Sequence, residues 1–281
     1  MGIKIITDSA CDMTVEEAKD KGIVLMPLTV TFGEESFKDG VELSHEGFFE
    51  KLIETDELPT TSQIAPFDYE QEFTRAVENG DEVLCITISS KLSGCFQSAN
   101  IAAEEARGNI AIVDSGSASI GQRILVELAA SLREKGMSLE EMAQTLEKEK
   151  ENIRVIALLD TLEYLKKGGR ISAAVAMAGT MLNIKPVIAI ENGEVGLLGQ
   201  ARGSKKGNNK LIELIQKEGG IDFSKPCALT YAGLSRSLLD KYIEDSKELY
   251  RDYEGELTIG SVGCAIGTHI GPGAIGAAFF V

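Results

Sequence analysis

In the first 150 residues, short apolar runs alternate with segments that have the pattern of amphipathic helices. The apolar runs include KIITD (4–8), EVLCITIS (82–89) and NIAIVD (109–114), and a helical pattern follows each of them. Parallel strands are joined by crossover helices and are buried on both faces, so they are apolar along their whole length. The alternation therefore predicts a parallel, three-layer α/β domain.

Several helix starts can be located by their capping residues. Thr14 and Glu17 have the spacing of a capping box, as do Ser138 and Glu141. Pro66 occupies a favoured first helical position. We also expect a strand segment in VLMPLTVTF, helices in HEGFFEKLIE and SGCFQSANIAAEEA, and a long helix near 119–135.

The second half has a different pattern. VIAIENGEVGLL (187–198) consists of two apolar runs around Asn-Gly, which is the strongest short signal for a β-hairpin. Strands are expected at 226–233, 256–263 and 277–281, with helices in KLIELIQKE and SLLDKYIEDSKELYRDY. We predict a second α/β domain with a mixed or antiparallel sheet. The boundary is placed near residue 150, which gives domains 1–150 and 151–281.

Charge and composition exclude several classes of function. The net charge of −16 opposes binding to nucleic acids and leaves at most a transient contact with anionic membranes. The five cysteines are scattered and the two histidines are few, so we expect neither disulfides nor a metal site. No signal peptide precedes the first strand, which favours a cytoplasmic location.

A nucleotide cofactor is not expected either. GPGAIG (271–276) matches a dinucleotide fingerprint in letters only, because the following AAFFV has the pattern of a strand and leaves no room for the helix. No Walker A motif is present. We therefore expect no cofactor.

Small polar residues follow the predicted parallel strands. The clusters are Thr7-Asp8-Ser9, Ser89-Ser90 with Ser93, Asp114-Ser115, and Thr60 to Gln63 before the Pro66 helix. Each cluster alone could cap a helix or close a turn. Together, at the edge where parallel sheets bind ligands, they also suggest a binding site.

His269 adds an imidazole to these hydroxyls. One interpretation is a hydrolase or acyltransferase with Ser93 as nucleophile and His269 as base, although a G-x-S-x-G elbow is absent. The other is non-catalytic recognition of a small carboxylate by hydroxyls and a histidine, without an arginine among them. The glycines around His269 also fit a simple turn before an edge strand.

Six segments resemble the DegV family along the whole chain. They are TDS near the start, TSQ (61–63), ISSKLSGCFQSA (88–99), TLEYLKKGGRIS (161–172), IKPV (184–187) and THIGPGAIG (268–276). The resemblance implies two α/β domains with a buried acyl chain between them. It also implies a fatty-acid-binding protein that is not catalytic alone.

The resemblance assigns roles to particular residues. Thr61, Ser62, Ser93 and His269 match positions around the fatty-acid carboxylate. Arg170 and Arg202 match positions that serve an ATP-dependent fatty acid kinase subunit, to which the protein presents a bound acid such as palmitate. For Arg170, the residues alone equally fit a solvated turn after a helix that ends in KK.

Three features depart from the family pattern or leave alternatives open. Cys95 and Phe96 replace hydroxyl-bearing residues, which predicts a less polar site there. Gly207 stands where a larger helix former is usual. ISAAVAMAGTML (171–182), with Met177 and Met181 one turn apart, could be a wall of the acyl tunnel or an ordinary buried helix.

Overall fold

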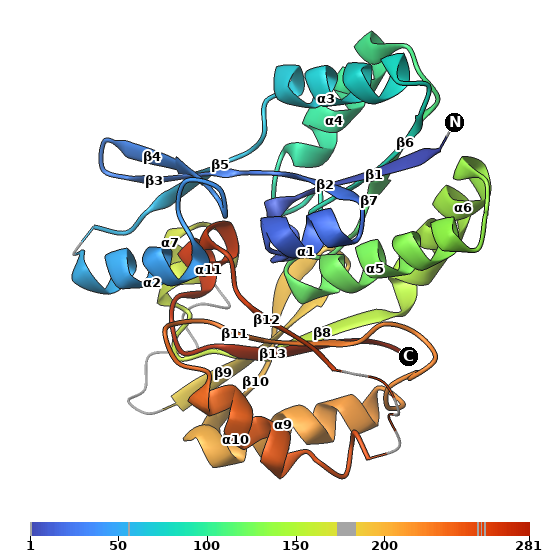
Figure 1. Ribbon diagram of the computed structural model, residues 1–281. Helices are drawn as coiled ribbons and strands as arrows, with labels where there is room; N and C mark the ends of the chain where they lie inside the picture. The colour runs from blue at the N-terminus through green and yellow to red at the C-terminus, as the bar shows by residue number, and fades with distance from the viewer. Residues whose placement is uncertain (1, 56, 173–183, 252, 254, 256) are drawn as a thin grey trace.

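The computed structural model describes residues 2–281 except 56, 173–183, 252, 254 and 256. Figure 1 shows helices, a parallel sheet, helices, a mixed sheet and helices stacked in that order. The strands are β1 (Ile3–Asp8), β2 (Ile23–Met26), β3 (Thr29–Phe32), β4 (Glu35–Lys38), β5 (Thr60–Ser62), β6 (Glu82–Thr87), β7 (Ile110–Asp114), β8 (Ile153–Leu158), β9 (Ile184–Glu191), β10 (Glu194–Arg202), β11 (Ala228–Tyr231), β12 (Thr258–Ser261) and β13 (Ile275–Phe280). The helices are α1 (Val15–Asp20), α2 (His45–Glu54), α3 (Pro66–Glu78), α4 (Cys95–Ala106), α5 (Ile120–Glu134), α6 (Leu139–Glu149), α7 (Glu163–Lys167), α9 (Ser204–Lys217), α10 (Ser237–Asp245) and α11 (Cys264–Ile270).

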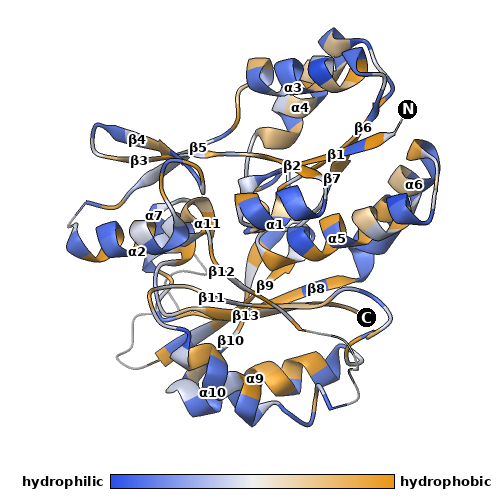
Figure 2. Ribbon diagram, in the orientation of Figure 1, coloured by the Kyte–Doolittle hydropathy of each residue, from blue (hydrophilic) through white to orange (hydrophobic). Residues whose placement is uncertain are grey.

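The parallel sheet has the strand order β2-β1-β6-β7. Helices α3 and α4 cover one face, and α1, α5 and α6 cover the other. The strands of both large sheets are mainly hydrophobic, as Figure 2 shows. The predicted parallel three-layer arrangement is confirmed, as are the capping boxes at Thr14 and Ser138 and the helix that begins at Pro66.

The mixed sheet has the order β10-β9-β8-β13-β11-β12 among the described strands. Its pairs are antiparallel except β11 with β12. The predicted hairpin is β9–β10, and its turn residues Asn192 and Gly193 have φ values of 51° and 82°. Positive φ at both central positions is the geometry of a type I′ turn, which Asn-Gly favours.

Helix α5 lies between the two large sheets. It packs against β1 and β6 on one side and against β8, β11 and β13 on the other. Eleven of its residues are buried, including Leu125 and Ala129. The buried residues include the polar Gln122 and Arg123, and Arg123 is paired with Glu17 and Glu127. Because both of its sides are covered, α5 joins the two halves through one continuous layer.

The segment 24–32 is not one strand. It divides at Pro27, which has no N–H to donate to a sheet ladder, into β2 of the parallel sheet and β3 of a separate antiparallel sheet, β4-β3-β5. Residues 60–62, expected in a loop, form β5, with Thr61 opposite Val30. Strand β5 has the sequence TTS, which shows no alternation of apolar and polar residues. The sequence pattern therefore did not reveal the small sheet.

The alternative of a simple turn before an edge strand is wrong, and the helix expected in SLLDKYIEDSKELYRDY is shorter than predicted. His269 lies in α11 and not in a plain turn, and β13 is an interior strand between β8 and β11 and not an edge strand. Helix α10 ends at Asp245, and its C-cap residue is the buried Ser246, whose hydroxyl donates to the Tyr242 carbonyl at 2.6 Å. The division into two domains near 150 stays a prediction, since α5 packs against both large sheets.

Gly207 is explained by packing. A Cβ at this buried position of α9 would lie 2.4 Å from Cδ2 of Leu158 in β8. The glycine lets the helix approach the mixed sheet, so its departure from the usual residue serves the core of this chain.

We expect Gly207→Ala to lower the free energy of unfolding by about 1–3 kcal/mol, the usual cost of overpacking a core. Helix propensity alone would raise it by about 1 kcal/mol. Urea denaturation of this variant and of Asn209→Ala, an exposed position in the same helix, separates the two effects. A more stable Gly207→Ala protein would contradict the packing argument.

Candidate functional site

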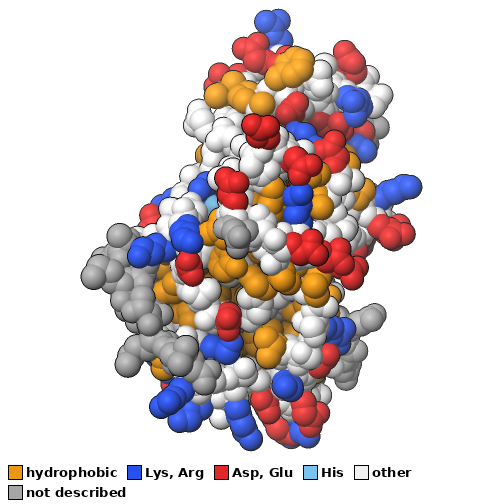
Figure 3. All heavy atoms as spheres, turned by 90° about the vertical axis from the view of Figure 1, so that its left-hand side faces the viewer, with side chains coloured by type: hydrophobic (Ala, Val, Ile, Leu, Met, Phe, Trp, Pro, Cys, Tyr) orange, Lys and Arg blue, Asp and Glu red, His pale blue; other side chains and the backbone are white. Residues whose placement is uncertain are grey.

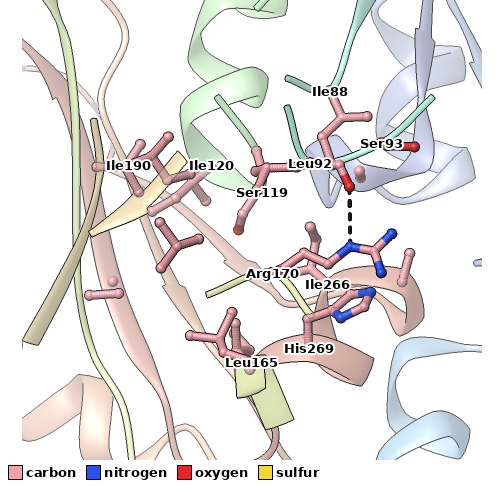
Figure 4. A pocket seen from close by; sticks show the side chains of 18 of the residues that line it. Ile88, Leu92, Ser93, Ser119, Ile120, Leu165, Arg170, Ile190, Ile266 and His269 are labelled. Carbon is pink, nitrogen blue, oxygen red and sulfur yellow. Dashed lines mark hydrogen bonds between the residues drawn. The ribbon is translucent and has the colours of Figure 1, made fainter. Parts of the chain in front are cut away.

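A cavity of about 380 Å³ lies between the parallel sheet and the mixed sheet. Its walls are mainly aliphatic, and Figure 4 shows the side chains that line it. The labelled apolar residues of the wall are Ile88, Leu92, Ile120, Leu165, Ile190 and Ile266. Polar side chains gather at the end near Ser93, Arg170 and His269, whereas Ile120 and Ile190 lie toward the opposite end (Figure 4).

The cavity opens from the carboxyl edge of the parallel sheet. Ala10 follows β1 and Ile88 follows β6, and both residues line it. The sheet order reverses between β1 and β6, because β2 lies on one side of β1 and β6 on the other. Open α/β sheets bind their ligands at such a switch point.

The residues that were predicted to bind a carboxylate all lie at this cavity. Thr61, Ser62, Ser93 and His269 all line it, although they come from β5, from the loop before α4 and from α11. Arg170 lines it as well, which the sequence interpretation of a site without arginine did not anticipate. Arg202 is exposed at the end of β10 and is not among the lining residues.

Thr61 and His269 form a hydrogen bond across 208 sequence positions. Their Oγ1 and Nε2 atoms are 2.9 Å apart. In the tautomer that carries its proton on Nε2, the ring donates to Thr61, whose hydroxyl can then donate to a third group. The Nδ1 atom of His269 is buried and finds no hydrogen-bond partner among the described residues.

Burial controls the charge of this histidine. Desolvation lowers the pKa of His269 to about 4, with a further contribution from the positive charge of Arg170. The imidazole is therefore neutral at pH 7. It contributes polarity and shape to the cavity without a second positive charge.

Gly168 is needed because the His269 ring lies against it. A Cβ at this position would be 2.2 Å from Nδ1 of His269. Gly168 directly follows Lys167, the last residue of α7. Its φ of −73° is available to any residue, so close approach and not backbone freedom requires glycine.

Arg170 is fixed by backbone carbonyls. Its Nε donates to the Leu92 carbonyl at 3.2 Å, the bond drawn in Figure 4, and its Nη1 donates to the Gly168 carbonyl at 2.7 Å. The guanidinium thus has a defined position beside His269. These two bonds do not fit the interpretation of Arg170 as part of a free, solvated turn.

Ser93 and His269 do not form a nucleophile–base pair. The Ser93 hydroxyl donates to Sγ of Cys95 at 3.3 Å and accepts from the Cys95 N–H at 3.4 Å. His269 meets Thr61 instead. A hydroxyl bonded to a thiol is not activated for attack, so the geometry does not favour the hydrolase or acyltransferase alternative.

Several of the strand-end polar residues support the fold and do not line the cavity. The Asp8 carboxylate accepts the N–H of Ile88 at 2.8 Å and that of Ala10 at 3.2 Å, and burial raises its pKa to about 6. Asp114 accepts from Gly116 at 2.9 Å. For these two clusters, the interpretation as turn and loop supports is the correct one.

Ser119 is a lining residue that the sequence did not indicate. It has a φ of 55° and donates a short hydrogen bond to Asp12. Ser119 directly precedes α5, which begins at Ile120. The proposed tunnel wall around Met177 and Met181 lies almost wholly outside the described residues.

The surface and the helices add two observations. On the face seen in Figure 3, hydrophobic side chains gather in the middle and charged side chains lie above and below them. Within the described part of the chain, no helix is both long enough and apolar enough to cross a membrane.

The fold and the cavity define an α/β protein with two large sheets, one small sheet and an internal, mostly apolar chamber that is polar at one end. Residues 2–281 match the model of a family described as "Uncharacterised protein, DegV family". The chain is 35% identical to a DegV domain-containing protein of Caldanaerobacter subterraneus over 281 residues, which cover 99% of this chain and 98% of the relative. The chain belongs to the DegV family, as its sequence motifs predicted.

Solved structures of the family have the same fold. A DegV family protein from Thermus thermophilus, described in terms of fatty acid binding, is 33% identical with a TM-score of 0.88, and the match covers 100% of both chains. DegV of Bacillus subtilis, described as a fatty acid binding protein, is 31% identical with a TM-score of 0.85, again over 100% of both chains. A stearic acid-binding protein from Eubacterium ventriosum is 28% identical with a TM-score of 0.87, over 99% of this chain and 97% of that one.

The depressed pKa of His269 predicts a pH-dependent stability. Between pH 6.5 and 4 the unfolded chain protonates this histidine and the folded chain does not, so acidification favours unfolding. We expect the stability advantage of the wild type over His269→Gln to shrink by about 2–4 kcal/mol from pH 7 to pH 4. Denaturant titrations of both ligand-free proteins measure this difference, in which the common titration of Asp8 and Asp12 cancels. A difference independent of pH would mean that His269 has an ordinary pKa.

Proposed function

We propose that this chain binds a long-chain fatty acid, such as palmitate, with the acyl chain in the cavity and the carboxylate at Thr61, Ser62, Ser93 and His269. The observation that carries the proposal is the half-buried Thr61–His269 pair at one end of a mainly aliphatic chamber. Family members whose descriptions name bound fatty acids support the same ligand class.

The apolar walls supply most of the binding free energy. An acyl chain that buries ~14 methylenes gains roughly 11 kcal/mol, at about 0.8 kcal/mol for each. This gain exceeds much of the range of association costs. The polar end then needs only to orient the head group and to reject uncharged lipids.

The polar end suits a carboxylate. Hydroxyls of Thr61, Ser62 and Ser93 can donate hydrogen bonds, and the Arg170 guanidinium provides the positive charge that the neutral His269 does not. The Cys95 thiol is a weaker acceptor than the hydroxyl usual in the family, so it competes little for the Ser93 hydroxyl.

We also propose that the protein is not catalytic alone and presents the carboxylate to a separate, ATP-dependent fatty acid kinase subunit in the cytoplasm. Arg170, beside the carboxylate position, would offset the charge of a forming acyl phosphate. Arg202, exposed at the end of β10, would contact the partner. Domain 1–150 would supply the hydroxyls around the carboxylate, and 151–281 would supply Arg170 and His269, close the acyl tunnel and carry the partner surface.

Ligand content tests the binding proposal. Protein purified from bacteria should carry stoichiometric long-chain fatty acid, as measured by denaturation, extraction and mass spectrometry. Ile190→Trp, which fills the apolar end of the chamber, should abolish the bound lipid. Ser93→Ala should retain it, because a hydrogen bond to a charged group contributes only about 1.5–3 kcal/mol.

Loss of lipid from Ser93→Ala together with full retention by Ile190→Trp would contradict the dominance of the apolar walls. A wild-type protein that carries no fatty acid, and binds none when palmitate is added, would overturn the proposal itself.

Arg170 tests the kinase step. Arg170→Ala should lower palmitate affinity only several-fold, since the apolar walls remain, and should nearly abolish acyl-phosphate formation with a DegV-partner kinase subunit and ATP. Arg170→Lys, which keeps the charge but loses the planar fork, is the matched control and should recover only part of the activity. If palmitate binding and acyl-phosphate formation fell equally, Arg170 would act only in binding the lipid and not in the kinase step.

A further inference from the structure

The helix that carries His269 cannot hold its own position. Helix α11 has seven residues, and a helix this short is not stable by itself in water. Its first-turn N–H groups need acceptors, but its N-cap residue is Gly263, which offers no side chain. The acceptors therefore have to come from elsewhere in the chain.

Asp39 supplies them from the other half of the sequence. Its Oδ1 accepts the N–H of Cys264 at 2.9 Å, and its Oδ2 accepts the N–H of Ala265 at 3.2 Å. The residue is 1% exposed. An anion that takes two adjacent N–H groups at a helix N-terminus also gains from the helix dipole.

Asp39 is itself tied to the small sheet. It directly follows β4, its own N–H donates to the Leu28 carbonyl at 2.9 Å, and its Oδ2 also accepts the Ser9 hydroxyl at 2.8 Å. Thr61 lies on β5 of this same sheet. Both members of the Thr61–His269 pair are thus tied to one small sheet. Thr61 belongs to it, and α11, which carries His269, packs against β3 and β5 and is held at its N-terminus by Asp39.

We propose that Asp39 is a positioning residue for the ligand head group: by holding the N-terminus of α11 against the β4-β3-β5 sheet, it sets His269 opposite Thr61. It does not line the cavity and does not touch the ligand. This inference rests on the proposed fatty-acid function and adds a residue that decides whether the carboxylate is preferred over an uncharged head.

The geometry of a carboxylate is required at this position. An asparagine in place of Asp39 would have the same shape but only one acceptor oxygen, so its NH₂ group would face an N–H group of α11. A buried donor left without an acceptor is unfavourable. We expect α11 to shift until these donors are satisfied, and His269, in its last turn, to move with it.

The test compares two ligands that share a tail. Palmitate and 1-hexadecanol differ only at the head, and their affinities for delipidated protein can be measured by calorimetry or by displacement of a fluorescent fatty acid. Asp39→Asn should weaken palmitate binding about tenfold, the loss of about one charged hydrogen bond, and hexadecanol binding by less than about twofold. Leu239→Ala, in the remote core on the buried face of α10, is the control for destabilisation alone.

A second measurement needs no ligand. The chain has two histidines, His45 and His269, so ¹⁵N-histidine NMR signals can be assigned with a single His45→Gln variant. Asp39→Asn should shift the His269 ring signals of the ligand-free protein, and Leu239→Ala should not. Should Asp39→Asn fail to fold, Ser9→Ala removes one hydrogen bond to the same carboxylate and should produce a smaller change in the same direction.

The outcomes separate the two proposals. Equal weakening of both ligands by Asp39→Asn, or unchanged His269 signals, would overturn the positioning role while leaving fatty-acid binding intact. A wild type that binds neither ligand would overturn the proposed function, and the NMR comparison would still decide whether Asp39 sets the position of His269.

Discussion

Helix α5 acts as a spacer between two sheets, and the internal chamber depends on it. A helix with side chains is about 10 Å thick, so the parallel and mixed sheets cannot collapse onto each other where α5 lies between them. The chamber begins where the helix begins, since Ser119 and Ile120 at its N-terminus are part of the wall. A packed core fills one side of the interlayer space, and the other side remains open to a ligand.

Residues that are far apart in the sequence form the polar end of the chamber. Thr61 comes from a three-residue strand, Ser93 from the loop before α4, Arg170 from the residues after α7, and His269 from α11. None of these elements is stable alone, so each is positioned by its neighbours. The close contact of Gly168 with the histidine ring and the two backbone carbonyls that hold Arg170 show how tightly the group is assembled.

The side chains at the polar end of the chamber favour an anion without burying an excess of positive charge. The chain carries a net charge of −16, yet the described residues at the polar end of the chamber are one arginine, several hydroxyl-bearing residues and a neutral imidazole whose pKa is lowered by burial. A second positive charge would have been costly to bury. This balance is compatible with the proposed binding of a single carboxylate in a mainly apolar chamber.

The sequence by itself determined the alternation of strands and helices, the parallel sheet, the β9–β10 hairpin and, through its motifs, the residues that meet at the site. The alternation, the parallel sheet and the hairpin depend on local propensity and on periodic burial, which the chain displays residue by residue. The site residues were indicated by the polar clusters that follow the strands and by the resemblance to the family's motifs. Tertiary structure alone decided the rest. The small sheet around Thr61, the interior place of β13, the inclusion of Arg170 in the chamber and the capping of α11 by Asp39 all depend on contacts between residues far apart in the chain. Such contacts leave no periodic signal, because a single buried acceptor or one carbonyl bond is specified by geometry and not by pattern.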